Sequence, residues 1–426
     1  MNQQLFSYIA ACPTAYQAVS HTAKMLEAED FMPLHEADDW HVVPGKSYYV
    51  TRNASSLIAF RIPKSGLGPF RMAAAHGDSP SFKIKENAEN PSGAYVRLDT
   101  EKYGGMLCAS WMDRPLSVAG RVIVRTEAGV ETRLVDLKEP CALIPNVAIH
   151  MNRKANEGYA YDLAVDMLPL WQGDSFRRRI ADAAGVTEEA LLSTDLFLYN
   201  PQPGVAWGEY ISAPRLDDLQ CAFAALTGFL AARGQADVPV FCLFDNEEVG
   251  SETKQGAAST FLWDVLSRLA GRDLPRLLAS SFLVSCDNAH AIHPNHPELA
   301  DKNHAPVLNG GVVVKYNASQ RYTTDAVSAA VFGLCCEKAR VSVQRYANRA
   351  NLAGGSTLGS IANTQVSVNT VDVGLPQLAM HSAFETAGAR DTEALSRALA
   401  VFYRSSLEAL GDGAYRLVLP EEGERV

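Results

Sequence analysis

Histidine and carboxylate residues follow directly after four apolar segments of the chain. The segments and residues are FRMAAA with His76 and Asp78, VPVFCLF with Asp245, Glu247 and Glu248, FLVSC with Asp287, and QLAM with His381. If the segments are strands of an open α/β sheet, these residues lie beyond its carboxyl edge, where such folds place their sites. Asp217 and Asp218 begin a predicted helix and can join them. The pattern therefore predicts one site rich in carboxylates and imidazoles.

Carboxylates gathered in one cleft need positive charge, because like charges at short range raise each other's pKa. One divalent cation relieves the repulsion and two relieve it better, and two-metal hydrolytic sites hold their ions about 3.5–4 Å apart. Mixed His and Asp/Glu ligation suits zinc, with manganese and cobalt as alternatives. Asp78 follows His76 by two residues, so its carboxylate can hold the second imidazole nitrogen. We therefore expect a site for divalent metal ions.

Each of these residues also has a structural explanation when it is considered alone. Glu247 and Glu248 could begin a helix, where carboxylates interact favourably with the helix dipole. Asp217 and Asp218 could cap the helix that they precede. His381 could be a structural histidine. The metal hypothesis rests on the joint placement of these residues at strand and helix ends.

Four further histidines follow Asp287, in a loop that contains Pro and Asn. They are His290, His293, His296 and His304. They could form a second metal site with Asp287, but their spacing in an irregular loop lacks helical geometry. We favour substrate-side or structural roles for them.

Composition excludes several classes of protein. The chain has 426 residues, 47% hydrophobic and 20% charged, and a formal net charge of -10, which argues against a nucleic-acid-binding face. It has no apolar run near the roughly 18 residues that a membrane helix needs, and its start does not resemble a secretory signal. The eight cysteines form no C-x-x-C pair, so we expect free thiols and a cytoplasmic location.

The periodicity of the chain changes twice. Residues 90–210 are mostly predicted strand and loop, with a hairpin in 122–137, and resemble an insertion. After Pro214, apolar strands alternate with helices, including one predicted over 253–271 and a last one opened by 381–388. This order predicts an α/β fold with a mostly parallel sheet between helix layers and a second, smaller β-rich inserted domain.

Nine stretches of the chain match motifs of a known family, in the family's order. They are AAAHGDSPSFKIK, DRPLSVAGRV, PNVAIHMNR, ISAPRLDDLQCAF, LFDNEEVGSETKQGA, SCDNAHAIHPNHP, VVVKYNASQRYTTD, GGSTLGSI and LAMHSAFETAG. On these motifs the chain resembles the aspartyl aminopeptidase family, dinuclear zinc aminopeptidases that form tetrahedral dodecamers. The resemblance implies a zinc-peptidase-like catalytic domain made of residues 1–85 and 215–426. Residues 86–214 would form an inserted β-rich dimerisation domain.

The resemblance also implies roles for single residues. The implied ligands are His76, Asp217 and Asp287 for one ion and Asp217, Glu248 and His381 for the other, with Asp217 bridging. By the same match Glu247 is the general base, and Asp78 orients the imidazole of His76.

Further residues match the substrate side of the family's site. His150 corresponds to a histidine that reaches the active site of a neighbouring subunit, which implies a homo-oligomer, a dodecamer built from dimers. Lys315 and Tyr322 correspond to substrate-pocket residues, and His290 and His293 to the histidines of an Asp-x-x-His-x-x-His stretch. Lys315 could pair with an acidic substrate side chain, or instead contact the peptide backbone or Asp325.

The expected function is a metal-dependent aminopeptidase that removes N-terminal residues, with a preference for Asp and Glu, from short peptides. Glu247 would take a proton from water activated by the two ions. Two alternatives stay open: a carboxypeptidase or amide deacylase on the same dinuclear scaffold, and a non-catalytic assembly protein. No nucleic-acid or membrane partner is expected.

Overall fold

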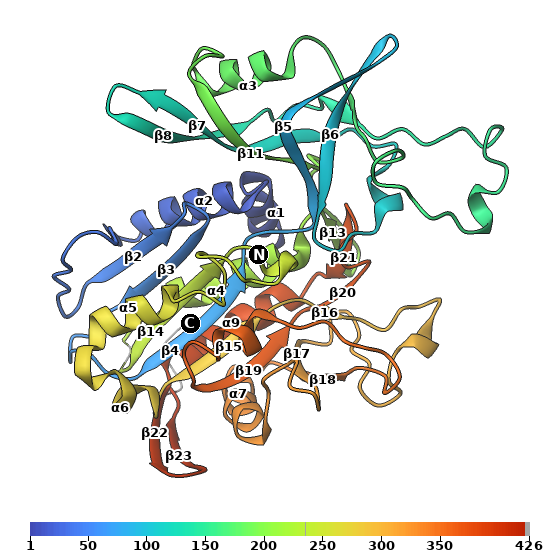
Figure 1. Cartoon of the computed structure of the whole chain (residues 1–426). Helices are drawn as coiled ribbons and strands as arrows, with labels where there is room; N and C mark the ends of the chain where they lie inside the picture. The colour runs from blue at the N-terminus through green and yellow to red at the C-terminus, as the bar shows by residue number, and fades with distance from the viewer. Residues whose placement is uncertain (235, 422–426) are drawn as a thin grey trace.

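The computed structural model describes residues 1–234 and 236–421. Within them a nine-stranded sheet forms the centre of the molecule (Figure 1). In spatial order its strands are β1 (Met32–Leu34), β2 (Ser47–Arg52), β3 (Ser56–Arg61), β14 (Val238–Phe244), β4 (Phe70–His76), β15 (Phe282–Cys286), β19 (Asn369–Gly374), β17 (Val312–Tyr316) and β18 (Val343–Ala347). The central strands β14, β4, β15 and β19 run parallel, which confirms the predicted sheet.

Helices cover both faces of this sheet. One face carries α1 (Asn2–Ala11), α2 (Ala15–Glu27), α4 (Leu216–Ala231), α7 (Ala326–Lys338) and α9 (Asp391–Arg404), and the other α5 (Phe261–Ala270), α6 (Leu274–Leu278) and α8 (Leu358–Ala362). Strand side chains point alternately to opposite faces, so Ala73 and Ala75 of β4 join the first core and Met72 and Ala74 the second. Burial on both faces explains why these strands read as continuous apolar runs.

A second, antiparallel sheet lies above the first in Figure 1 and has its own apolar core. In spatial order its seven described strands are β8 (Gly129–Asp136), β7 (Ser117–Thr126), β11 (Leu191–Tyr199), β5 (Ser81–Ser92), β6 (Tyr95–Tyr103), β10 (Leu170–Trp171) and β9 (Ala142–Leu143). Helix α3 (Phe176–Ala184) packs beside it. The predicted hairpin is confirmed as β7–β8, while the domain boundary at 85/86 stays a prediction, since β5 begins at Ser81.

Two smaller sheets complete the described chain. The five-stranded one contains β12 (Val205–Trp207), β13 (Tyr210–Ala213), β21 (Glu385–Gly388), β20 (Pro376–Leu378) and β16 (Ala289–His290), and the two-stranded one β22 (Ser406–Gly411) and β23 (Ala414–Val418). Within the described residues, the structure contains no helix with the length and apolarity that crossing a bilayer would require.

Two predicted helices differ from the structure. The helix expected over 253–271 begins only at Phe261, because the chain before it turns so tightly that a Cβ on Gly256 would lie 2.1 Å from the Ser251 carbonyl oxygen. Residues 381–388 do not open the last helix. They form a turn and then β21, which pairs with β13, and α9 starts at Asp391.

A buried ion pair joins β4 to the residue before β14, its neighbour in the main sheet. Arg71, 1% exposed, donates to Asp237 Oδ2 at 2.9 Å, and the same oxygen accepts from the backbone N–H of Leu407 at 3.3 Å. Burial lowers the pKa of Arg71, and Asp237 opposes that change. Removing one member would leave the other charge buried without its partner.

We therefore expect Asp237→Asn to lower the free energy of unfolding by about 3–5 kcal/mol, measured by urea denaturation. The control is Glu408→Gln, which breaks an exposed pair in which Arg416 lies 2.8 Å away. Glu408→Gln should lower the free energy of unfolding by less than about 1 kcal/mol, since exposed ion pairs contribute little to stability. Equal losses in the two variants would contradict the prediction.

Candidate metal centre

The predicted site residues come together at one edge of the main sheet. His76 ends β4, the 3₁₀ turn η3 (Glu247–Val249) follows β14, and Asp287 follows β15. Asp217 lies at the start of α4, where the backbone is not yet helical. His381 follows β20, which belongs to the five-stranded sheet rather than the main one. The convergence of segments distant in sequence is therefore as predicted, although one segment arrives from another sheet.

Asp217 lies between two imidazoles. Its Oδ1 is 3.6 Å from His76 Nε2, and its Oδ2 is 3.5 Å from His381 Nε2. Glu248 Oε2 lies 3.4 Å from the same His381 nitrogen. Among the described residues, three sets of potential ligand atoms lie within 4.8 Å of one another: His76, Asp217, Asp218 and Asp287; His76, Glu247 and Glu248; and Asp217, Glu248 and His381. The arrangement offers two adjacent cation sites that share Asp217.

Asp218 ties two of the strand ends together. Its Oδ2 accepts a hydrogen bond from the backbone N–H of His76, and its Oδ1 accepts one from that of Asn288, both at 3.2 Å. The Asn288 side chain donates to Gln220 at 3.1 Å and to Gln377 at 2.6 Å. Burial raises the pKa of Asp218 well above its usual value. Because both of its oxygens are occupied, Asp218 holds the backbone of the neighbouring residues in place.

Glu385 performs the same task for the other two segments. It is 1% exposed, and it accepts hydrogen bonds from the backbone N–H of Asp217 at 3.0 Å and of His381 at 2.7 Å. Burial raises its pKa to about 8. The sequence reasoning missed Glu385, and the available signal was a carboxylate four residues after His381 in a segment that was assigned to a helix.

Asp78 lies where sequence reasoning placed it, beside His76. Its Oδ1 is 3.3 Å from His76 Nδ1, and its carbonyl oxygen is 3.1 Å from the same nitrogen. Its two carboxylate oxygens also accept from the backbone N–H groups of Glu247 and Glu248, each at 3.2 Å. Asp78 thus connects the first imidazole to the turn that carries both glutamates.

The electrostatics of the centre favour a cation. Burial opposes ionisation of Asp217, but the imidazoles of His381 and His76 lower its pKa below the usual value. Burial and the Asp217 charge raise the pKa of Glu248 well above its usual value, and burial raises that of Glu247 to about 8. Among the described residues, the buried atoms Asp217 Oδ1 and Glu248 Oε1 have no hydrogen-bond partner. Divalent cations would satisfy these oxygens and offset the repulsion, so the donor set fits them.

Lys315 lies behind Asp287 and is almost completely buried. Its Nζ donates to the Asn288 carbonyl oxygen at 2.8 Å and lies 3.6 Å from Asp287 Oδ1. The ammonium is also 5.5 Å from the ring centre of Tyr322. Asp325, considered as its partner, caps α7 instead. Lys315 therefore brings a positive charge to the edge of the centre and helps to hold Asp287.

The remaining predicted residues lie outside the three ligand sets. His290 and His293 line a neighbouring cavity of about 350 Å³, together with Arg349 and Met380. His150 is exposed, in the long loop after β9. The described chain does not bring His150 to its own centre.

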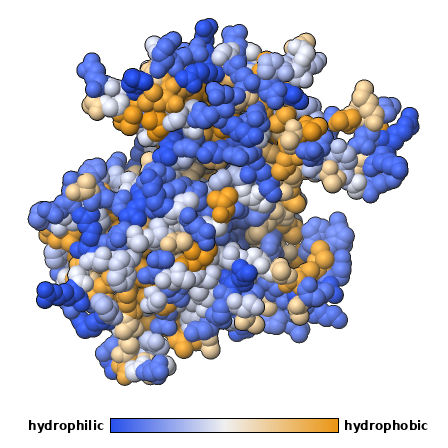
Figure 2. Space-filling model, in the orientation of Figure 1, coloured by the Kyte–Doolittle hydropathy of each residue, from blue (hydrophilic) through white to orange (hydrophobic). Residues whose placement is uncertain are grey.

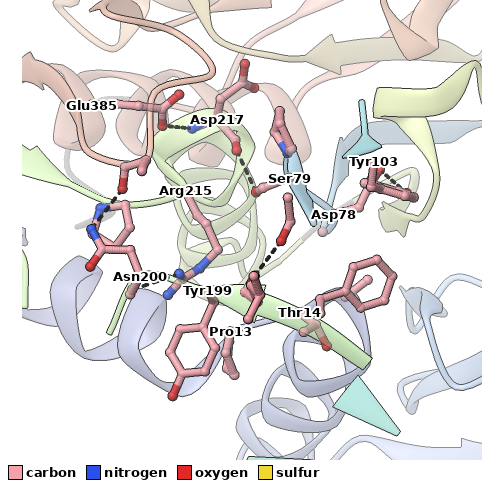
Figure 3. Close-up of a pocket in the computed structure, with 18 of the residues that line it drawn as sticks. Pro13, Thr14, Asp78, Ser79, Tyr103, Tyr199, Asn200, Arg215, Asp217 and Glu385 are labelled. Carbon is pink, nitrogen blue, oxygen red and sulfur yellow. Dashed lines mark hydrogen bonds between the residues drawn. The ribbon is translucent and has the colours of Figure 1, made fainter. Parts of the chain in front are cut away.

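A pocket lies against the same carboxylates (Figure 3). Its volume is about 50 Å³, enough for more than one water molecule. Asp78, Tyr103, Arg215, Asp217 and Glu385 line it. It belongs to the same centre and lies on the side of the second sheet.

Comparisons with known proteins point to one family. A family model described as aminopeptidase I zinc metalloprotease (M18) matches residues 8–403. A relative from Clostridium novyi (strain NT), named "Probable M18 family aminopeptidase 2", is 42% identical over 410 residues, which cover 91% of this chain and 95% of the relative. A solved structure of the Ape4 and Nbr1 complex matches with a TM-score of 0.90 at 33% identity, covering 94% of this chain and 85% of that one. The S. cerevisiae mApe1 dodecamer matches with a TM-score of 0.82 at 27% identity, covering 93% and 95%.

The geometry predicts that Asp217→Asn weakens zinc binding by at least the roughly 10–100-fold typical of residues that merely support a metal site. The change removes the negative charge between the two imidazoles. Zinc content by mass spectrometry and competition with a chelator would measure it. In the parent protein, zinc at 100 times its dissociation constant should stabilise the fold by about 2.7 kcal/mol, which chelation would remove.

The matched control is Asp391→Asn, since Asp391 is 1% exposed but lies outside the three ligand sets. It should bind zinc as the parent does. Parent-like zinc binding by Asp217→Asn would contradict the shared-ligand arrangement.

Proposed function

The chain belongs to the M18 family of aminopeptidase I zinc metalloproteases, and from this premise we propose that it removes Asp and Glu from the free N-termini of short peptides. The family membership that its motifs indicated is confirmed, and it makes the protein an aminopeptidase. The observation that carries the proposal is Asp217 between two imidazoles, with the Glu247 carboxylate 4.0 Å from His76 Nε2.

The proposed ligands form two sets that share Asp217. They are His76, Asp217 and Asp287 for one ion, and Asp217, Glu248 and His381 for the other. When bound, two zinc ions would supply the Lewis-acid polarisation of the scissile carbonyl and of the attacking water. Manganese or cobalt would suit the same mixed donor set.

Glu247 is the proposed general base. Its side chain is 13% exposed, whereas those of Asp217 and Glu248 are each 4% exposed, so it can reach a substrate and a water molecule. The hydrogen bond from its backbone N–H to Asp78 fixes the turn that carries it. Glu247 takes a proton from the attacking water and delivers it to the leaving amine.

The cavity beside the centre is the proposed site for the first side chain of the substrate. The imidazoles of His290, His293 and His296 and the guanidinium of Arg349 line it beside one carboxylate, that of Asp301, and this excess of donor groups suits a substrate carboxylate. Lys315 and Tyr322 complete the proposed pocket from behind Asp287, where the ammonium adds positive charge.

We also propose a homododecamer built from dimers, located in the cytoplasm. Apolar side chains gather on the upper part of the molecule in the view of Figure 2. Val147, Ile149 and Met151 surround His150 and are 53%, 48% and 85% exposed, which is typical of a surface that another subunit covers. A structural relative is itself described as a dodecamer. The eight free cysteines suit a reducing compartment.

The decisive variant for the mechanism is Glu247→Gln. We expect it to keep parent-like zinc content and to lose about 10²–10⁴-fold in kcat, because the amide cannot accept the proton. Steady-state hydrolysis of an Asp-initiated peptide, with zinc measured in parallel, tests this. Turnover at the parent rate would remove Glu247 as the base.

A peptide-library digest tests the substrate class. Peptides that begin with Asp or Glu should be cleaved about tenfold or more faster than peptides that begin with Leu or Lys, since a hydrogen bond to a charged group contributes about 1.5–3 kcal/mol. Acetylating the N-terminus should abolish cleavage by an aminopeptidase. Cleavage that continues after acetylation would instead favour the deacylase or carboxypeptidase alternative.

A further inference from the structure

One contact to the centre comes from the second sheet. Tyr103 is the last residue of β6, and its hydroxyl donates to Asp78 Oδ2 at 2.7 Å. The same hydroxyl oxygen accepts a hydrogen bond from Asn246 Nδ2 at 2.9 Å. Figure 3 shows Tyr103 and Asp78 side by side at the edge of this pocket. The phenol therefore uses its donor and its acceptor on two residues next to Glu247: Asp78, which accepts from the backbone N–H of Glu247, and Asn246, which precedes it.

The ring of Tyr103 is held by its own sheet. It packs edge-on against Phe197 of β11, with ring centres 5.4 Å apart. The β6 strand pairs with β5 up to Tyr103, which lies opposite Ser81. The hydroxyl thus projects from a fixed scaffold rather than from a free loop, as a positioning group requires.

Asp78, which the Tyr103 hydroxyl contacts, itself contacts three residues of the centre. Its oxygens accept from the backbone N–H groups of Glu247 and Glu248, and Oδ1 lies beside His76 Nδ1. A carboxylate with four neighbouring donors needs a defined orientation, because rotation about its last bond would break several hydrogen bonds at once. The Tyr103 hydroxyl, the shortest of these contacts, sets that orientation.

The residues directly after Tyr103 run along the same centre. Gly104 has a φ of +76°, and a Cβ there would lie 3.1 Å from Glu248 Cβ. A Cβ on Gly105 would lie 3.6 Å from His381 Nδ1, and the backbone N–H of Leu107 donates to the His381 carbonyl oxygen at 3.0 Å. Residues 103–107 therefore touch segments of both proposed cation sites.

We propose that Tyr103 is a positioning residue of the metal centre: through Asp78 it fixes His76 and the turn of Glu247 and Glu248, so that the second sheet helps to set the catalytic geometry. The assignment rests on the proposed function for its effect on turnover. A merely structural aromatic would need only the ring, whereas this role needs the hydroxyl.

The test is Tyr103→Phe, which keeps the ring against Phe197 and removes both hydrogen bonds to the centre. Zinc affinity, measured by competition with a chelator, should fall about 10–100-fold, as for other residues that support metal ligands. For an Asp-initiated peptide, kcat should fall by a similar factor, while KM changes less than about threefold. In the zinc-free state, the melting temperature should stay near that of the zinc-free parent.

The matched control is Tyr49→Phe, because the Tyr49 hydroxyl donates to Glu27 at 2.6 Å, away from the metal centre. This variant should keep parent zinc affinity and kcat. A second variant, Gly104→Ala, tests the contact of residues 103–107 with the centre independently. Its Cβ would crowd Glu248, so this variant should also bind zinc more weakly.

The outcomes separate the two proposals. If the parent binds zinc but cleaves no peptide, the proposed function fails, while zinc affinity still tests Tyr103. Parent-like zinc affinity and kcat in Tyr103→Phe would overturn the positioning role. A raised KM with unchanged zinc affinity and kcat would also overturn it, because the hydroxyl would then contact the substrate directly.

Discussion

Repulsion among buried carboxylates is the constraint on which the arrangement of this protein depends. Ligand atoms of Asp217 lie within 4.8 Å of those of Asp287 on one side and of Glu248 on the other, and burial raises the pKa of Glu248 and of Asp287. Such a cluster is stable only if positive charge enters it and if the chain around it cannot relax outward. Bound divalent cations would supply the positive charge. Hydrogen bonds from backbone N–H groups to Asp78, Asp218 and Glu385 keep the chain around the cluster from relaxing outward.

This constraint explains why the centre draws on three sheets. The parallel strands of the main sheet bring His76, Glu248 and Asp287 to one edge, since their carboxyl ends coincide. His381 arrives from the five-stranded sheet, and Tyr103 arrives from the seven-stranded one. Several elements packed around one charged cluster leave it little freedom to expand, which is the rigidity that a preorganised site requires.

The sequence predicted the parts of this arrangement that follow from local pattern. Continuous apolar runs revealed the central strands, and a polar residue after each run revealed the edge of the site. The pattern failed where pairing across the fold decides the structure. Residues 381–388 were assigned to a helix, yet they form β21 against β13, and this error hid Glu385. Tyr103 was missed because it lies in the seven-stranded sheet, whereas its partner Asp78 follows a strand of the main sheet. A contact between two sheets leaves no periodic pattern in the sequence.

The hydrogen bonds of the acidic side chains separate them into two groups, which residue type alone does not distinguish. Asp217 and Asp218 are adjacent, buried and of the same residue type, and both fall within the first ligand set. Both oxygens of Asp218 accept backbone N–H groups, so binding a cation there would compete with the hydrogen bonds that hold two strand ends. Asp217 Oδ1 has no such partner among the described residues. A buried acceptor without a hydrogen bond is costly unless something binds it, so this oxygen makes Asp217 the better candidate for a metal ligand and gives Asp218 the supporting role.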